Sequence, residues 1–600
     1  MSFDAFLMRM QGSWWQSVSA LLLLLLAARG IGCWLLPRRR DEFIRLALGM
    51  AVMAWFYPWW RRSMPGWVSA ALLIPAARGV WGVRWSEIGR DKWLYLALGI
   101  FGAATLGSAF LPPFTWDEQV YQTVLFARFQ ESFGRTDNPY SAYPLLPHFF
   151  MMWVRSWSGW SLPRLVVWFL SLLLAGKLYL EVARRSKSAL FGAVASACVM
   201  FSPLAMALHR EFYAEAFVAL FALAGFLVLE SSDESSSRPD DARRQLLAGV
   251  FAGACVAVKL TGAGAALVLV ILAAKRRRLH CFIAAAAVTA LPFFIRPWLT
   301  FGSPFYPFGS AWWGGEKARA VENIYRMLGD YGPGKLLGAT TGWLSVCVAD
   351  DRLYDGVWGI GVLVLTVLLL FALWQRRERS ALVSFSALVA GYVFWAMTSQ
   401  QGRFLYPLLF PAVLLLADNF QVFAERRVRL AVLALPMLGA LLSCNRIYPH
   451  LRHHWIAWRG VSTARRDPGR FLAAATSDPG YFNALKLLGK TPENARVLLL
   501  CERRSLHVPR SCEHGTPLFQ ELRLTPVPRS ADELWQGIKD FDYVLLGSTR
   551  DRIDQLKGYD RVEQVLERHL STLQRHGRIR LVRVPDKVEC QPLLEVVHEP

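Results

Sequence analysis

Two adjacent carboxylates, Asp117 and Glu118, follow a long apolar run in the stretch PPFTWDEQVYQ. A carboxylate at such a place can act as a general base that removes the proton of a reacting hydroxyl group. The stretch also fits the start of a helix, because Thr115 and Glu118 have the spacing of a capping box. The two interpretations are compatible if Glu118 caps the helix while Asp117 stays free. Tyr121 then lies one helical turn after Asp117.

Other charged residues interrupt apolar runs at ends that we expect to share one side of a membrane. A charge within the bilayer costs at least a few kcal/mol, so it usually serves a ligand, a partner charge or a water-filled cavity. Each residue alone could instead snorkel to the interface or form a structural ion pair. Together they predict one polar cavity that faces outward. These residues are His209, Arg210, Glu211, Glu215, Lys259, Arg296 and Arg403.

The elements that position these residues are predicted to be membrane helices. The chain has 600 residues, of which 54% are hydrophobic and 19% are charged, and its mean hydropathy is +0.28. Many of its 25 tryptophans lie near the ends of apolar runs, as in an interfacial aromatic belt. The net charge of +22 comes from clusters between these runs, which indicates orientation in a membrane. No nucleic-acid-binding motif is present.

About fourteen apolar runs approach the length of roughly 20 residues that spans a bilayer. The basic clusters between them fall on one side if the spans alternate, and we expect that side to be cytoplasmic. Arg61 and Arg62 break this pattern, which suggests that the second or third span is irregular or interfacial. The candidate spans lie near residues 15–36, 43–60, 66–82, 93–111, 163–183, 188–207, 212–230, 245–258, 262–274, 280–296, 356–374, 381–398, 404–420 and 429–446.

The predicted fold class is an all-α polytopic membrane protein of about 12–14 transmembrane helices with a small C-terminal α/β domain. Residues 1–446 form the membrane domain, with external loops at about 112–162 and 296–355, and residues 447–600 form the external domain. In the external domain Cys501 and Cys512 could form a disulfide and leave Cys590 over, or all three could be buried thiols. Its predicted strands are ARVLLLC, FDYVLLG and RIRLVRV, and its predicted helices are SADELWQGIKD and RVEQVLERHLSTLQRHG.

From about Phe101 to Asp418 the sequence resembles the GT-C superfamily of integral membrane glycosyltransferases. It is similar to the bacterial relatives of protein O-mannosyltransferases and to the aminoarabinose transferases that modify lipid A. No single motif is specific, but their order and common external placement carry the resemblance. Glu215 stands where the family has Asp, Val258 replaces a Thr, and Pro297 and Ser303 also depart from the pattern. The matching stretches are Asp117, Glu118, Tyr121 and Ala127, YPLLPHF from Tyr143, SACVMFSPLAMALHREFYAEAF, GVFAGACVAVKLTG, RPWLTFGSPFYPF and Gly402–Pro411.

The resemblance implies a GT-C-like helical bundle that transfers a sugar from a polyprenyl-phosphate-linked donor to an acceptor hydroxyl on the outer face of the membrane. Asp117 would be the general base, and direct displacement with a single base implies inversion. Arg403 and Lys259, with Arg210 or Arg296, would hold the phosphate leaving group. The expected substrate-binding residues are Glu118, Tyr121, Arg210, Glu215, Lys259, Arg296 and Arg403.

No cofactor is required by this interpretation, although Asp117, Glu118, His209 and Glu215 could supply ligands to a divalent metal. The expected location is the inner (plasma) membrane, crossed several times, with the active site and the C-terminal domain facing the periplasm. The expected partners are the lipid-linked donor, the bilayer and an acceptor glycan, lipid or protein that the sequence does not specify.

A transporter or flippase of lipid-linked sugars is the main alternative, because it would bind the same phosphate without needing a base. No inverted repeat is detectable, which disfavours this alternative. A structural or assembly partner that keeps the fold without the activity is a third hypothesis, and the presence of Asp117 argues against it. Formation of a glycosidic product by the purified protein, as against movement of the lipid alone, separates the transferase from the flippase.

Overall fold

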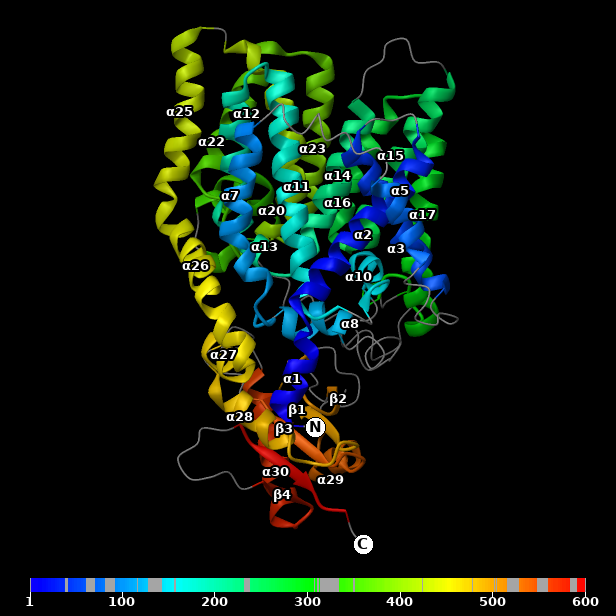
Figure 1. Ribbon diagram of the computed structural model, residues 1–600, viewed down its shortest axis with the longest axis vertical. Helices are drawn as coiled ribbons and strands as arrows, with labels where there is room; N and C mark the ends of the chain where they lie inside the picture. The colour runs from blue at the N-terminus through cyan, green and yellow to red at the C-terminus, as the bar shows by residue number, and fades with distance from the viewer. Residues whose placement is uncertain are drawn as a thin grey trace.

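The computed structural model consists of a helical bundle with a small sheet domain beneath it (Figure 1). In Figure 1 the N-terminus lies beside this sheet domain, next to the last part of the chain. The structure describes residues 2–37, 41–60, 71–80, 92–115, 117–127, 143–155, 158–306, 308–309, 312, 334–348, 351–423, 425–476, 478–500, 502, 504–514, 528–547, 559–582 and 591–598, apart from 231–237.

Most of the predicted spans correspond to a helix, which confirms the predicted fold class of a helical membrane protein with a small α/β domain. The predicted span 66–82 lies largely outside the described residues, and only α5 represents it. The helices of the first half are α1 (Phe3–Gln11), α2 (Trp14–Leu35), α3 (Glu42–Trp60), α5 (Leu73–Val80), α7 (Lys92–Ala109), α8 (Thr123–Ala127), α10 (Leu146–Met152), α11 (Ser161–Ser186), α12 (Ala189–Met200), α13 (Pro203–Arg210), α14 (Glu215–Glu230), α15 (Arg238–Val258), α16 (Ala263–Ala274) and α17 (Leu279–Phe301).

Not every apolar helix is long enough to cross a bilayer. Among the described residues, four helices are long and apolar enough, and two bent pairs would raise the number to six. One bent pair is α12 with α13, which meet at 67°, where Ser202 caps α13 and Pro203 begins it. The helices that follow α17 are α20 (Lys335–Val348), α21 (Asp351–Tyr354), α22 (Ile360–Arg376), α23 (Arg379–Met397), α24 (Tyr406–Asp418), α25 (Arg426–Leu442) and α26 (Cys444–Arg466).

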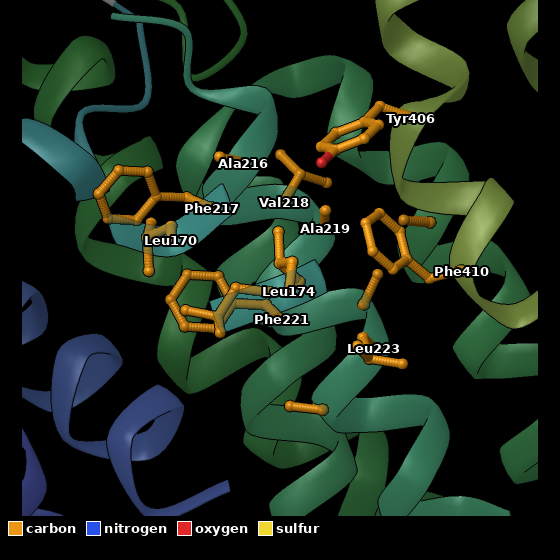
Figure 2. Close-up of a cluster of buried hydrophobic side chains, with 14 of the residues drawn as sticks. Leu170, Leu174, Ala216, Phe217, Val218, Ala219, Phe221, Leu223, Tyr406 and Phe410 are labelled. Atoms are coloured by element: carbon orange, nitrogen blue, oxygen red, sulfur yellow. The ribbon is translucent and has the colours of Figure 1, made fainter. Parts of the chain in front are cut away.

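The core of the bundle forms around α14, whose residues from Glu215 to Leu229 are all buried. Phe217 and Phe221 on α14 lie close to Leu170 of α11, and Phe410 of α24 faces the same helix (Figure 2). A helix that is apolar on every side is stable only when neighbouring helices surround it. The first residue of α14, Glu215, is therefore held at a fixed place at one end of the bundle.

The C-terminal domain contains a five-stranded sheet with the strand order β2-β1-β3-β5-β4. The strands β1, β2 and β3 are parallel, and β5 runs antiparallel to both β3 and β4. The three predicted strands correspond to β1, β3 and β4, whereas β2 and β5 were not predicted. The elements are α27 (Pro468–Thr476), α28 (Pro479–Leu488), β1 (Arg496–Leu500), β2 (Ser511–His514), α29 (Ala531–Ile538), β3 (Tyr543–Leu546), α30 (Tyr559–Arg575), β4 (Ile579–Leu581) and β5 (Leu593–Val596).

The two ends of the chain share one hydrophobic core. Phe3 and Leu7 of α1 pack with Leu472 of α27 and Leu485 of α28. The same core includes Trp160, which precedes α11 of the bundle. The predicted boundary at residue 447 falls within α26. The helices α25 and α26 meet at a bend of 66°, and α26 leads on to α27. Cys501 and Cys590 lie outside the described residues, so the proposed disulfide stays a prediction.

Candidate active site

Glu118 begins a short π-helix, η3 (Glu118–Gln122), that continues into α8, and Asp117 is the N-cap residue of η3. Each turn of a π-helix contains one residue more than an α-helical turn, and such turns are frequent at functional sites. Thr115 does not form the expected capping box with the backbone. Its hydroxyl instead donates to the Glu118 Oε2 atom at 2.9 Å, while the Thr115 carbonyl accepts from the Gln119 amide at 3.1 Å.

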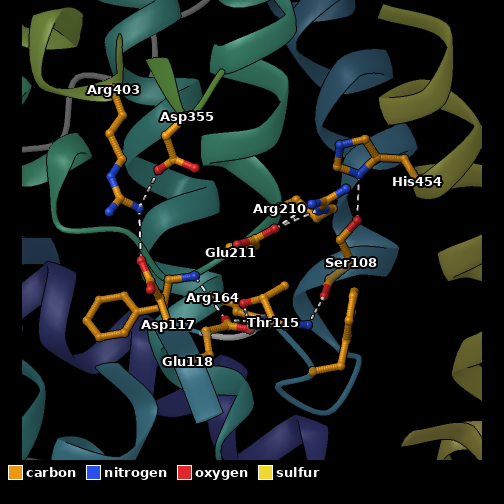
Figure 3. Close-up of polar contacts among 12 residues, drawn as sticks. Ser108, Thr115, Asp117, Glu118, Arg164, Arg210, Glu211, Asp355, Arg403 and His454 are labelled. Atoms are coloured by element: carbon orange, nitrogen blue, oxygen red, sulfur yellow. Dashed lines mark hydrogen bonds and ion pairs between the residues drawn. The ribbon is translucent and has the colours of Figure 1, made fainter. Parts of the chain in front are cut away.

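Glu118 is fully buried and belongs to the framework of the site. Its Oε1 atom accepts from the Arg164 Nε–H at 2.6 Å and from the Phe212 amide at 2.9 Å, and its Oε2 atom pairs with the Arg164 Nη2 group. Arg164 is 1% exposed and also donates to the carbonyls of Ser108 and Leu111, both at 3.2 Å. Both Glu118 oxygens are therefore occupied by protein groups (Figure 3).

Asp117 faces a different group of residues. Its Oδ2 atom lies 2.8 Å from the Arg403 Nη1 atom and accepts from the Tyr121 hydroxyl at 3.3 Å. The Asp117 side chain is 21% exposed, in contrast to that of Glu118. Arg403 comes from the 3₁₀ turn η7 (Gly402–Leu405) before α24, and its Nε–H donates to the Gln401 Oε1 atom at 3.0 Å.

A second cation and two further carboxylates complete the cluster around Arg403. The Lys259 Nζ atom lies 3.0 Å from Glu215 Oε1, which is 3.7 Å from Arg403 Nε. Lys259 lies over the ring of Phe404 at 4.1 Å. Glu215 begins α14 and Lys259 follows α15, so three separate segments of the bundle bring these charges together.

Asp355 also belongs to the cluster, although it was not predicted from the sequence. Its Oδ2 atom lies 3.7 Å from Arg403 Nη1, the same nitrogen that contacts Asp117 (Figure 3). Asp355 has a positive φ of 55° and Gly356 follows at 114°. Such a turn is unusual for a residue with a side chain and is retained where the surrounding structure holds it. The only sequence signal for it was an Asp-Gly pair just before a predicted span.

The turn at Asp355 is fixed against the segment that carries Arg403. The Trp358 indole donates to the Gly402 carbonyl at 2.9 Å. The ring of Trp358 stacks on that of Tyr406, with an interplanar angle of 7° and 5.7 Å between centroids. The two contacts hold Asp355 and Arg403 at one fixed separation.

Comparison with known proteins gives one matching family model and two solved structures of similar fold. Residues 136–399 match the model of glycosyltransferase family 87. The fold is similar to the crystal structure of ArnT from Cupriavidus metallidurans bound to undecaprenyl phosphate, with a TM-score of 0.52 and 13% identity over 84% of this chain and 98% of that chain. The apo structure of the same ArnT gives a TM-score of 0.48 at 14% identity, over 84% of this chain and 97% of that one. No curated protein sequence matches the chain.

The segment 136–399 thus resembles a family of glycosyltransferases, and the chain as a whole shares the fold of ArnT. The segment that matches family 87 includes Glu215, Lys259 and Asp355 of the charged cluster. Asp117 and Arg403 lie outside that segment, so their place in the site rests on the geometry of the structure.

The structure brings five of the predicted site residues into one charged cluster: Asp117, Tyr121, Glu215, Lys259 and Arg403. Arg296 borders the cluster, because its Nη2–H donates to the Tyr143 carbonyl at 2.7 Å and the ring of Tyr143 contacts that of Tyr121 edge-on at 6.3 Å. Arg210 forms an ion pair with its neighbour Glu211 at 2.5 Å.

The four residues named as metal ligands do not converge. Glu118 is held by Arg164 and Glu215 by Lys259, while His209 is buried with its ring 5.7 Å from that of Phe101. Among the described residues, no group of three or more His, Cys, Asp or Glu side chains could hold a metal ion. A metal site built on this set is not supported by the geometry.

Protonation states in the cluster follow from burial and charge. Burial, and then the Asp117 carboxylate, raise the pKa of Tyr121 well above its usual value of 10.0, so the phenol stays protonated and donates to Asp117. Burial lowers the pKa of Arg403, but Asp117 and then Asp355 outweigh this effect and raise it. Arg403 is therefore a permanent cation beside the Asp117 carboxylate.

Proposed function

We propose that the protein transfers a sugar from a polyprenyl-phosphate-linked donor to an acceptor hydroxyl on the outer face of the membrane, with inversion at the anomeric carbon. The observation that carries the proposal is the contact between Asp117 and Arg403 with Lys259 close by. A base and a pair of cations in one cluster are the two parts that displacement of a phosphate by a hydroxyl requires.

One N–H group of Arg403 is available to bind a phosphate. Its Nε and Nη1 groups are used by Gln401 and Asp117, but its Nη2 group makes no hydrogen bond to any residue that the structure describes. The Lys259 ammonium has three donors, and within the same part of the chain only Glu215 accepts from it. Planar guanidinium and ammonium donors that converge on one oxyanion stabilise it as a leaving group.

Asp117 is the group placed to accept the proton of the acceptor hydroxyl. Its side chain is partly exposed, whereas Glu118 one residue later is occupied by Arg164. The Tyr121 hydroxyl and the Arg403 guanidinium fix the orientation of Asp117 before the acceptor binds. A single positioned base with direct displacement predicts inversion.

The donor lipid would remain in the hydrocarbon while its phosphate reaches the cluster. A small hollow of about 10 Å³ lies next to the cluster between α16 and α23 and is lined by Thr261, Gly264, Gly391, Phe394, Trp395 and Phe404. Phe404 lines this hollow, and the Lys259 ammonium lies over its ring. In the relative of similar fold, ArnT, the structure was determined with undecaprenyl phosphate bound.

The test begins with native mass spectrometry of the purified protein in nanodiscs to identify the co-purified polyprenyl lipid. Donors with radiolabelled hexose or pentose on that lipid are then incubated with the protein and with extracted envelope lipids, glycans and proteins. We expect a labelled glycosidic product whose anomeric configuration is opposite to that of the donor. Movement of the lipid across the bilayer with no labelled product would overturn the proposal in favour of a flippase.

A further inference from the structure

The C-terminal domain contacts the π-helix of the active site directly. The Leu506 amide, in the loop after β1, donates to the Gln119 carbonyl at 3.2 Å. Gln119 is the second residue of η3 and lies two positions after Asp117. The backbone of a domain that lies outside the bundle is thus bonded to the helix that carries the proposed base.

A second route joins the same loop to the active site. The ring of His507 meets that of Trp160 edge-on, at 5.6 Å and 87°. Trp160 immediately precedes α11, and Arg164 follows one helical turn later. Arg164 in turn holds Glu118 through both carboxylate oxygens. The loop after β1 therefore contacts η3 once directly and once through the start of α11.

The loop is held rigidly within its own domain. Arg504 is buried and pairs with Glu502 at 2.6 Å and with Asp478 at 2.7 Å. The Tyr481 ring lies 3.9 Å from the Arg504 guanidinium, and the Tyr481 hydroxyl donates to the Arg504 carbonyl. Leu506, two positions after Arg504, is fully buried. A buried ion pair of this kind adds little net stability but is costly to break, so it fixes one conformation of the segment around it.

We propose that the segment 504–508 is a positioning element of the active site, and that it sets the orientation of Asp117 toward Arg403 by bracing η3. The inference rests on the proposed function, in which Asp117 is the base. In many open α/β sheets the loops at the carboxyl ends of parallel strands bind ligands. Here the loop after β1 holds a catalytic helix of another domain.

The effect on catalysis should appear in turnover and leave donor binding unchanged. The proposed phosphate-binding residues Arg403 and Lys259 lie on other segments of the chain, and their hydrogen bonds go to Gln401, Asp117 and Glu215. A displacement of about 1 Å at a reacting group can cost roughly 100-fold in rate. Loosening the loop should therefore lower kcat about 10-fold while the donor KM stays within about 2-fold.

The experiment compares Glu502→Gln and Asp478→Asn with Glu595→Gln. An asparagine at position 478 still accepts from the Tyr481 amide and caps α28, so this variant removes the charge and keeps the fold of that helix. Glu595 pairs with Arg580 at 2.6 Å on the exposed part of the same sheet and is the matched control. Hydrogen exchange of the peptide covering residues 117–127 is measured with kcat and KM in full-length protein.

We expect faster exchange of this peptide and lower kcat in both loop variants, and wild-type values in Glu595→Gln. Unchanged exchange and kcat in a folded Asp478→Asn or Glu502→Gln protein would overturn the inference, whatever the change in thermal stability. If Glu502→Gln does not fold, Asp478→Asn decides alone. If the wild-type protein transfers no sugar, the proposed function fails, and the exchange of residues 117–127 still decides whether the loop braces η3.

Discussion

The structure predicts opposite behaviour for the two neighbouring carboxylates when each is neutralised. Asp117→Asn keeps the size of the side chain and can still accept from Tyr121, and the site is partly exposed. We expect a smaller loss of stability than in Glu118→Gln, because Glu215 and Asp355 remain as counterions, each 3.7 Å from Arg403. Turnover should fall by about 100-fold or more, the usual cost of losing a general base.

Glu118→Gln should instead lower the stability of the folded protein. The substitution leaves the Arg164 guanidinium buried without a counterion, although the carbonyls of Ser108 and Leu111 still accept from it. Breaking one partner of a buried ion pair costs about 3–5 kcal/mol. The amide oxygen of the substituted side chain can accept from Arg164 or from the Phe212 amide, which places the expected loss at the lower end of that range, about 3 kcal/mol.

The assay measures thermal unfolding of both variants in the same detergent, together with turnover at saturating donor and acceptor. We expect Glu118→Gln to unfold at a clearly lower temperature than Asp117→Asn, and Asp117→Asn to lose far more activity per folded molecule. The reasoning is refuted if Asp117→Asn keeps near-normal turnover. It is also refuted if Glu118→Gln is as stable as the wild type, because Arg164 would then not depend on that carboxylate.

Three further predictions concern the rest of the site and the topology. Arg403→Ala should weaken donor binding at least about 10-fold and Arg403→Lys should restore it only in part, because Lys lacks the planar fork; equal donor affinity in titration calorimetry would remove Arg403 from the phosphate site. Asp355→Asn should alter turnover less than Asp117→Asn, since Asp355 lies 3.7 Å from Arg403 and does not form the shorter 2.8 Å contact; a larger loss of kcat would make Asp355 the better candidate for the base. A cysteine introduced at Ser235 should be labelled only from the inside and one at Pro139 only from the outside, and the reverse pattern would overturn the orientation.

Much of the cluster could be predicted from the sequence because each residue interrupts an apolar run. Asp117, Lys259 and Arg403 are conspicuous for this reason, and the alternation of spans places their run ends on one side of the membrane. The structure brings these three residues within one network of contacts. The helices themselves could be predicted from the same apolar runs and from the length of about 20 residues that a bilayer requires.

Arg164 could not be found in this way. It sits at the start of a predicted span, where an Arg usually reaches the interface by snorkelling. Its actual partner, Glu118, lies 46 positions earlier, and only the packing of α11 against the segment after α7 brings the two together. A capping box was predicted because spacing alone cannot distinguish a Glu that bonds the backbone from one that bonds a distant Arg.

The contact between the C-terminal domain and η3 is likewise a tertiary feature. The sequence predicted the strand that becomes β1 but showed no sign that the loop after it would bond the Gln119 carbonyl. The π-helix has no sequence signature either, since its extra residue per turn is selected by the contacts on both of its sides.

The order of the two acids along η3 has a physical reason in this arrangement. Neighbouring residues of a helix point roughly 90–100° apart around its axis, so they cannot face the same partner. Glu118, with the longer side chain, reaches Arg164 on α11 and the amide of Phe212 in the interior. Asp117, with the shorter side chain, turns toward Arg403 and remains partly exposed, where a donor phosphate and an acceptor hydroxyl could meet. One acid thus anchors the helix so that the other is held still, which accounts for a carboxylate pair at the edge of a membrane domain.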